Sequence, residues 1–361
     1  MKTNENEKRS TNTHNKVKAL QNYHFSGIHA SHIGAIKSCL DYYNIDSSIS
    51  WLFGMTGHAF ITVVDEQMMN PNVGLPEESF YKLAKNLGLQ IEGYHKIISN
   101  DQFNSHQKKA WDKIRYAIDK NYPVFAKELD LGNETSLIYA YGNKGYYTHS
   151  WHEANGFHKG DGEIPWEMLG QNFCPCVECN ERSLGPSTYL GELSKGGLLS
   201  VHWATKTKRV ATERAFKEAL QLVLQLNKKE EYMWGQKTYY SGIRAYDHWI
   251  DSVRKGTILG FNMGYYTDIW HESRHHAVMF LEEIQAQIKT PEVQKALQVY
   301  KSIKTAYKQL NDLFPWMQPK NKIEDPFRRK ETVELLELIR DLEVKALKAL
   351  KKLSLSFGDD N

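Results

Sequence analysis

The spacing of apolar residues divides the chain into a mixed first half and a helical second half. Ile33, Ile36 and Leu40 follow one another at intervals of three and four, which predicts a helix near residues 30–43. This start, followed by alternating helical and strand-like runs, predicts an α+β domain that begins with a helix. Residues 79–91 are expected to form a helix that runs into a strand, and residues 105–121 a further helix. The strand-like runs are residues 59–64, 123–129, 135–142, 145–152 and 198–204.

Almost all apolar spacing after residue 205 is helical. Phe216, Leu220 and Val223 share one helix face, and a loop with three prolines at 315–326 separates two long helices. The second domain is therefore expected to be all-α. The predicted organisation is a disordered arm at 1–20, an α+β domain at 21–205, a helical domain at 206–355 and a tail at 356–361.

Composition suits about two globular domains with cores of their own, since 41% of the 361 residues are hydrophobic. The net charge of +3 gives no reason to expect a nucleic acid or an anionic membrane as partner. No apolar run is long enough to span a bilayer, and the polar start lacks a signal core. Four cysteines make no disulfide framework, so we expect a cytoplasmic protein with free thiols.

Three segments resemble one bacterial protein family. Residues 36–64, IKSCLDYYNIDSSISWLFGMTGHAFITVV, are similar to the N-terminal domain named after the butirosin-biosynthesis H protein, an aminoglycoside acyltransferase. Residues 123–170 resemble the central hairpin of that family, and residues 240–284 resemble the helical domain that often follows. The resemblance implies a papain-like fold of the NlpC and C39 peptidase type. It also implies acyl or aminoacyl transfer, or amide cleavage, in a bacterial peptide or secondary-metabolite pathway.

The chemistry of that fold needs a thiolate at a helix N-terminus and a histidine base on a neighbouring strand. The nucleophile is expected near Ala30 or Ser31, where there is no cysteine. The base is expected just before SLIYAYG, where Asn133, Glu134 and Thr135 stand instead. Two functions therefore remain open. The chain is an acyltransferase or amidase with an altered site, or it is an inactive module that binds a small molecule, a peptide or an acyl carrier protein.

Substitute nucleophiles lie on the first helix. Ser31 could act with His29 or His32 as its base, because a neutral serine needs a positioned base to attack. The alternative is that Ser31 caps the helix. Cys39 could react through its thiol, or it could be a small buried residue on a helix face.

Two further residues could carry acid–base chemistry. His58 follows a glycine inside the best-matched motif, where it could be an acid–base group, a ligand-binding residue or a structural hydrogen-bonding residue. Glu134 could replace the missing histidine if burial raised its pKa, or it could be an exposed loop carboxylate. Neither role requires a cofactor.

One cysteine cluster has the spacing of a metal site. Cys174, Cys176 and Cys179 form a C-x-C-x-x-C pattern that could hold zinc or copper(I) with a fourth ligand from elsewhere. Free surface thiols or a redox pair are the alternatives. The histidines nearest in sequence that could supply the fourth ligand are His149, His152 and His158.

Residues 271–275, HESRH, match the His-Glu-x-x-His pattern of zinc peptidases. On a helix, His271 and His275 lie one turn apart and could both reach a zinc ion. The charged Arg274 and the lack of a third ligand at a known spacing favour a solvated or interface helix instead.

Tyrosines and tryptophans are concentrated in residues 239–249 and 263–270. Aromatic side chains of this kind could line a pocket between the two domains or pack inside the helical bundle. The sequence leaves both interpretations open.

Overall fold

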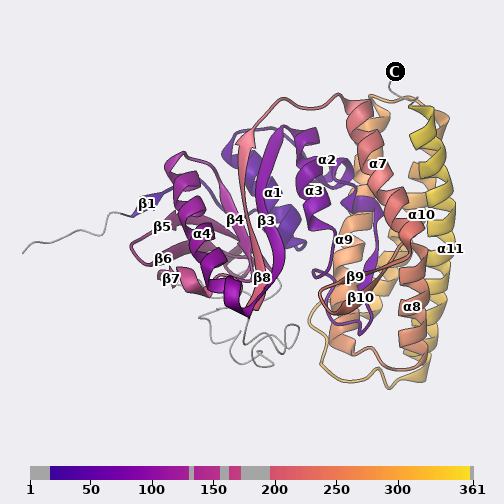
Figure 1. Cartoon of the computed structure of the whole chain (residues 1–361). Helices are drawn as coiled ribbons and strands as arrows, with labels where there is room; N and C mark the ends of the chain where they lie inside the picture. The colour runs from indigo at the N-terminus through magenta and orange to yellow at the C-terminus, as the bar shows by residue number, and fades with distance from the viewer. Residues whose placement is uncertain (1–16, 130–133, 155–161, 172–195, 358–361) are drawn as a thin grey trace, which may run out of the picture.

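A computed structural model describes residues 17–129, 134–154, 162–171 and 196–357 of the chain. An α+β part with a large sheet lies beside a bundle of long helices (Figure 1), which confirms the α+β class expected from the sequence. In this part of the chain, no helix combines the length and the apolar character needed to cross a bilayer.

Within the described residues, the large sheet has seven antiparallel strands. Its longest pairing runs from Leu89 opposite Lys206 to Ser99 opposite Gly196. The strand-like runs at 135–142 and 198–204 are confirmed as strands. The run at 145–152 is a strand only over Gly145–His149, since Trp151 and His152 belong to a short helix. In spatial order the strands are β3 (Leu89–Ser99), β8 (Gly196–Lys206), β4 (Val124–Lys127), β5 (Thr135–Tyr141), β6 (Gly145–His149) and β7 (Ile164–Pro165), with β1 (Lys18–Ala19) paired to β5.

Three helices of the first part lie near the sequence positions predicted for them, and a fourth, at residues 49–55, was not predicted. They are α1 (Ser31–Tyr42), α2 (Ile49–Met55), α3 (Glu77–Leu83) and α4 (Asn100–Asp119). Their apolar residues form the core, and Ile33, Ile36 and Leu40 of α1 are fully buried.

Two expectations for this part are wrong. The strand expected at 59–64 starts as a 3-10 helix at His58–Phe60, and only Val63–Asp65 forms a strand, β2. Gly57, with φ of +78°, begins that turn, and its carbonyl accepts a hydrogen bond from the Phe60 amide. The expected arm at 1–20 is too long, because β1 pairs with Tyr141 and Ala140 of β5.

The second part contains five long helices among the described residues, but it is not all-α. A hairpin of β9 (Glu231–Trp234) and β10 (Lys237–Ser241) turns at Gly235 and pairs with β2 through Tyr239 opposite Asp65. Aromatic and β-branched residues in β10 favour a strand over the helix expected there. The helices are α7 (Thr212–Lys229), α8 (Ile243–Arg254), α9 (Gly260–Gln285), α10 (Pro291–Leu313) and α11 (Pro326–Ser356).

A buried ion pair joins α9 to α11. The Arg274 Nε donates to Glu343 Oε1 at 2.6 Å, and both side chains are almost fully buried. The same guanidinium donates to the carbonyl oxygens of Ile61 at 2.7 Å and Ala59 at 3.3 Å. Arg274 therefore connects the segment before β2 to the helical bundle.

Gly54 lets α2 pack closely against α9. A Cβ at this position would lie 2.2 Å from ring carbons of Phe280, which itself packs on Phe60 and Phe216. Gly54→Ala is therefore expected to lower the free energy of unfolding by about 1–3 kcal/mol through overpacking, measured by urea denaturation. Gly34→Ala in α1 is the control, since its Cβ would meet the end of the Phe25 ring at 2.9 Å and Ser26 Oγ at 3.2 Å, and both of these side chains are only partly buried and can shift. Equal stability of both variants would contradict this prediction.

Candidate functional site

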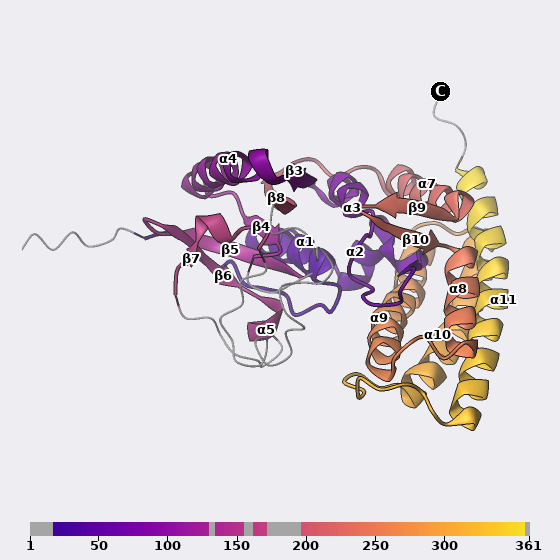
Figure 2. The same ribbon diagram turned by 60° about the horizontal axis from the view of Figure 1, so that its bottom comes forward.

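The N-terminal end of α1 lies against α9, between the sheet and the helical bundle (Figure 2). Glu272 of α9 accepts hydrogen bonds from the backbone amides of His29 at 3.4 Å and Ala30 at 3.3 Å. Burial raises the pKa of Glu272, while the charge of His29 and these amides oppose the rise. The helix terminus that holds a thiolate in the resembled family therefore holds a carboxylate of the same chain here.

His29 forms a close pair with Asp268 of α9. The His29 Nδ1 lies 2.5 Å from Asp268 Oδ2, and this hydrogen bond is the main cause of the raised pKa of His29, with Glu272 and Glu134 adding to it against desolvation. The histidine side chain is 36% exposed, and its Nε2 has no hydrogen-bond partner among the described residues. A carboxylate that orients one ring nitrogen leaves the other available for proton transfer.

Glu134 is buried, so the expectation of an exposed loop carboxylate is wrong. Its carboxylate accepts hydrogen bonds from the Tyr265 hydroxyl at 2.7 Å and from Asn72 Nδ2 at 3.2 Å. Asn72 Nδ2 also lies 3.4 Å from the carbonyl oxygen of His29. Glu134 thus belongs to a network that links the start of β5 to α1 and α9.

A buried cation lies behind this network. Lys127 Nζ donates to the carbonyl oxygen of Asn72 at 2.7 Å and forms an ion pair with Glu77, and both side chains are 2% exposed. The pairing satisfies both charges away from water, as burial requires. Lys127 and Glu77 therefore support Asn72 from the side of the sheet.

Ser31 stands at the expected nucleophile position, but its geometry is structural. Its side chain is fully buried, and Oγ accepts a hydrogen bond from the Thr135 amide at 3.0 Å. The hydroxyl does not cap α1, because Ala30 is the N-cap residue and makes no side-chain cap bond. Neither His29 nor His32 is hydrogen bonded to Ser31 Oγ, so no base activates it.

Cys39 is also unsuited to attack. It lies two turns along α1, about 12 Å from Ser31 at 1.5 Å per residue. Its thiol is fully buried, 3.5 Å from the Tyr23 hydroxyl, and burial raises its pKa to about 12. Such a thiol is not ionised at neutral pH, so the structure supports the buried-residue interpretation.

His32 and His58 form a buried pair in the core. Their ring centroids are 5.0 Å apart, and both rings lie near Phe80. Burial is the main cause that lowers the pKa of His58 to about 3, and burial likewise lowers the pKa of His32. The His58 Nδ1 lies 3.3 Å from Ser273 Oγ. Both histidines are neutral at physiological pH and pack as core residues.

The HESRH segment divides its side chains among different contacts. Glu272 faces α1, Arg274 is buried against Glu343, and Ser273 reaches His58. In the described part of the chain, no three His, Cys, Asp or Glu side chains are grouped so that they could hold a metal ion. These contacts are those of an interface helix.

The cysteine cluster at 174–179 lies outside the described residues, so Cys174, Cys176 and Cys179 stay a prediction, as do His158 and the side chain of His152 as metal ligands. Of the histidines proposed as fourth ligand, only His149 is described in full. Its Nδ1 lies 2.8 Å from Glu153 Oε2.

Aromatic side chains from three segments lie beside His29 and Glu134. Trp151 of α5 (Trp151–Ala154) lies 6.0 Å from the His29 ring, and Trp316 lies 6.4 Å from Trp151 and 4.9 Å from Tyr265. Tyr265 lies between the two parts of the chain, whereas Tyr246, Trp249 and Tyr266 are buried in the core, in agreement with aromatic side chains that pack inside the bundle. We call the set His29, Glu134, Tyr265, Asp268 and Glu272 the interdomain site.

Sequence reasoning missed Asp268, Asn72 and Trp316. No motif marks them, and each reaches the interdomain site from a distant segment. No family model matches the chain, and no curated protein is similar to it. Function therefore has to be inferred from the geometry of the interdomain site.

Proposed function

We propose that the chain is an acyl- or aminoacyl-transferring enzyme with a papain-like α+β domain, and that His29 is its general base. The observation that carries this proposal is the His29–Asp268 pair, which is partly exposed and leaves Nε2 unoccupied. The packing of α1 against β5 through Ser31 and Thr135 supports the papain-like assignment. The resemblance suggests a bacterial secondary-metabolite pathway in the cytoplasm.

The acceptor we propose is an amine. Glu134, Asp268 and Glu272 surround His29, and carboxylates of this kind attract an ammonium group. The rings of Trp151 and Tyr265 add faces on which a cation is stabilised. An amine held there loses its proton to a base before it attacks.

The proposed reaction is direct transfer from a carrier thioester. The amine nitrogen attacks the acyl carbon, the C–N bond forms and the C–S bond breaks. The ammonium group first releases one proton to solvent. His29 Nε2 then accepts the second proton, which the nitrogen loses as the amide forms, and passes it to the departing thiolate. A covalent intermediate is not part of the proposal, because Ser31 is buried without a base and Cys39 has a raised pKa.

A second candidate is a binding module without chemistry. Glu272 already occupies the α1 terminus where the resembled family holds its nucleophile, and this observation favours an inactive site. Such a module would bind an amine-containing small molecule, a peptide or a carrier protein at the interdomain site.

His29→Gln tests the enzyme proposal. With acyl N-acetylcysteamine thioesters and a panel of primary amines, we expect thiol release and amide formation above background, and a loss of about 100-fold in His29→Gln. Because its pKa is raised, His29 becomes a base only at higher pH, so the rate should rise with pH. Asp268→Asn should lower the pH at which the rate rises, because the substitution removes the main cause of the raised pKa of His29. His106→Gln on α4 is the matched control.

Two results would contradict the proposal. An acyl adduct on Ser31 or Cys39 in the intact mass would rule out direct transfer. Background rates for the wild-type protein, together with amine binding by calorimetry that Glu134→Gln weakens, would establish the binding module instead.

A further inference from the structure

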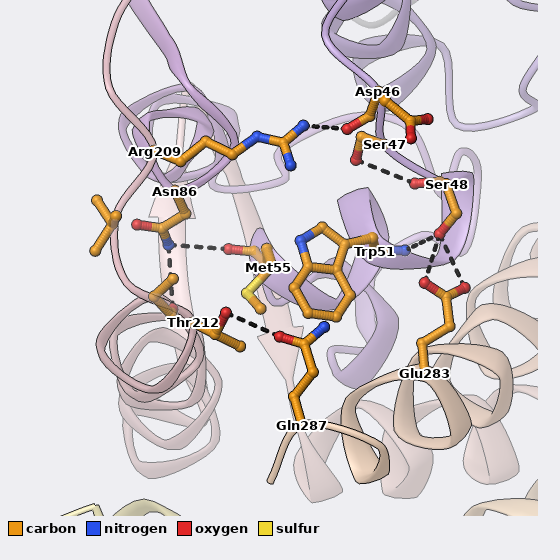
Figure 3. A pocket seen from close by; sticks show the side chains of 12 residues that line it. Asp46, Ser47, Ser48, Trp51, Met55, Asn86, Arg209, Thr212, Glu283 and Gln287 are labelled. Atoms are coloured by element: carbon orange, nitrogen blue, oxygen red, sulfur yellow. Dashed lines mark hydrogen bonds between the residues drawn. The ribbon is translucent and has the colours of Figure 1, made fainter.

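A cavity lies at the end of α9 that is farther from the interdomain site. Its volume is about 540 Å³, and it lies between the start of α2, the segment before α7 and the C-terminal turn of α9 (Figure 3). Cavities of roughly 300–1,000 Å³ are typical of small-molecule sites. Glu283 lies three turns beyond Glu272 on α9, about 16 Å along its axis, so the two sites are separate.

Apolar side chains form the base of the cavity. Met55 and Ala215 are buried below it, and the half-buried indole of Trp51 lies in its centre (Figure 3). The Phe280 ring packs edge-to-face with the indole, with 5.4 Å between the ring centroids, and this contact holds the indole in place. An indole fixed in this way offers a flat surface to an apolar group.

Opposite charges stand on either side of the indole. Figure 3 shows Arg209 above it and Glu283 on the other side. The guanidinium is anchored through Nε to the Leu87 carbonyl oxygen at 3.2 Å and through Nη2 to the Asp46 carbonyl oxygen, which leaves Nη1 for a ligand. The Glu283 carboxylate accepts hydrogen bonds from Ser48 Oγ at 2.8 and 2.9 Å and keeps further acceptor capacity. The Asp46 carboxylate points away from Arg209 in Figure 3.

Several polar groups at the cavity still lack a hydrogen-bond partner in the described residues. Asn86 is 3% exposed and lines the cavity, and its Oδ1 has no partner. Trp51 Nε1 has none either. The Gln287 Oε1 accepts from the Thr212 hydroxyl, which leaves the Gln287 amide nitrogen free. The Trp51 Nε1 and Gln287 Nε2 donors can therefore serve a ligand, whereas the Asn86 oxygen is closed to solvent and points away from the indole in Figure 3.

We propose that this cavity binds a short zwitterionic peptide, such as a dipeptide with apolar side chains, whose two charged ends are far enough apart to reach both sides of the indole. Its carboxylate pairs with Arg209, its ammonium group pairs with Glu283, and one of its side chains lies on Trp51. The proposal does not depend on the function proposed for the interdomain site.

Calorimetry and ligand-observed NMR with leucyl-phenylalanine test this site, and free phenylalanine, whose two charges are on one carbon, is the control that should bind more weakly. We expect a Kd on the order of 1 mM or tighter for a dipeptide. N-Acetyl-leucyl-phenylalanine lacks the ammonium group and leucyl-phenylalaninamide lacks the carboxylate, so each should bind at least about 10-fold more weakly, as expected for a lost hydrogen bond to a charged group.

Matched variants assign the contacts. Arg209→Gln and Glu283→Gln should each weaken leucyl-phenylalanine binding by about 10-fold. Arg214→Gln and Glu282→Gln should not, because these neighbours form surface ion pairs with Glu218 and Lys301 and do not line the cavity. Circular dichroism checks that each variant is folded, and Glu283→Gln keeps an acceptor for Ser48. The absence of binding at about 10 mM ligand, or blocked ligands that bind as tightly as the unblocked ligand, would overturn the proposal.

Discussion

Arg274→Met is expected to lower the free energy of unfolding by about 3–5 kcal/mol. The substitution leaves Glu343, 3% exposed, as a buried charge without its partner. It also removes the donor that serves the carbonyl oxygens of Ile61 and Ala59. Urea unfolding followed by circular dichroism measures the loss.

Two controls separate the ion pair from general damage. Arg254→Met breaks an ion pair with Glu337 that is about half exposed, and surface pairs of this kind contribute about 0–1 kcal/mol. The double variant Arg274→Met with Glu343→Leu removes both buried charges and should recover part of the lost stability. If Arg274→Met were as stable as Arg254→Met, the buried pair would not have the structural role assigned to it.

Acidification from pH 7 to pH 4 should destabilise the fold, and His58 should account for about 3 kcal/mol of the loss. In the unfolded chain this histidine binds a proton below about pH 6.5, whereas in the folded protein burial, Arg274 and His276 lower its pKa to about 3. Between these values the unfolded state binds more protons, so stability falls as the pH falls. His32, whose pKa burial also lowers, acts in the same direction.

The free energy of unfolding at several pH values checks this expectation. His58→Leu should reduce the slope between pH 6 and pH 4 by about 1.4 kcal/mol per pH unit, the contribution of one proton. Phe80→Leu, which alters the same core beside His58 without removing an ionisable group, should lower stability but leave the slope unchanged. An unchanged slope in His58→Leu would mean that His58 is protonated in the folded protein.

Local patterns predicted much of the fold because they depend on neighbouring residues. The spacing of Ile33, Ile36 and Leu40 reports one buried face, and α1 buries it. The apolar run at 59–64 led to the wrong prediction of a strand. Residues buried on all sides show no alternation of apolar and polar positions, so their pattern does not distinguish a strand from a turn. The β9–β10 hairpin depends on its partner β2, which lies far away in sequence.

The interdomain site could be predicted only in part. The resemblance suggested the positions of Ser31 and Glu134, and the hydrogen bond from the Thr135 amide to Ser31 Oγ brings those segments together. The partners Asp268 and Glu272 could not be inferred, because spacing shows that a helix has a face but not what packs on it. The HESRH segment is an example. Its Glu272 accepts hydrogen bonds from backbone amides at the start of α1, and no sequence motif predicts that contact.

The pairing of β2 with β10 has a consequence for biosynthesis. Val64 lies opposite Tyr240, so the segment that carries His58 and β2 has no strand partner until the ribosome has made the chain as far as β10. Until then the apolar edge of β2 is open to other chains, and slow, non-local pairing of this kind is exposed to aggregation. We therefore expect a fragment that ends near residue 205 to associate with itself, and the two halves to fold together in the cell as one unit.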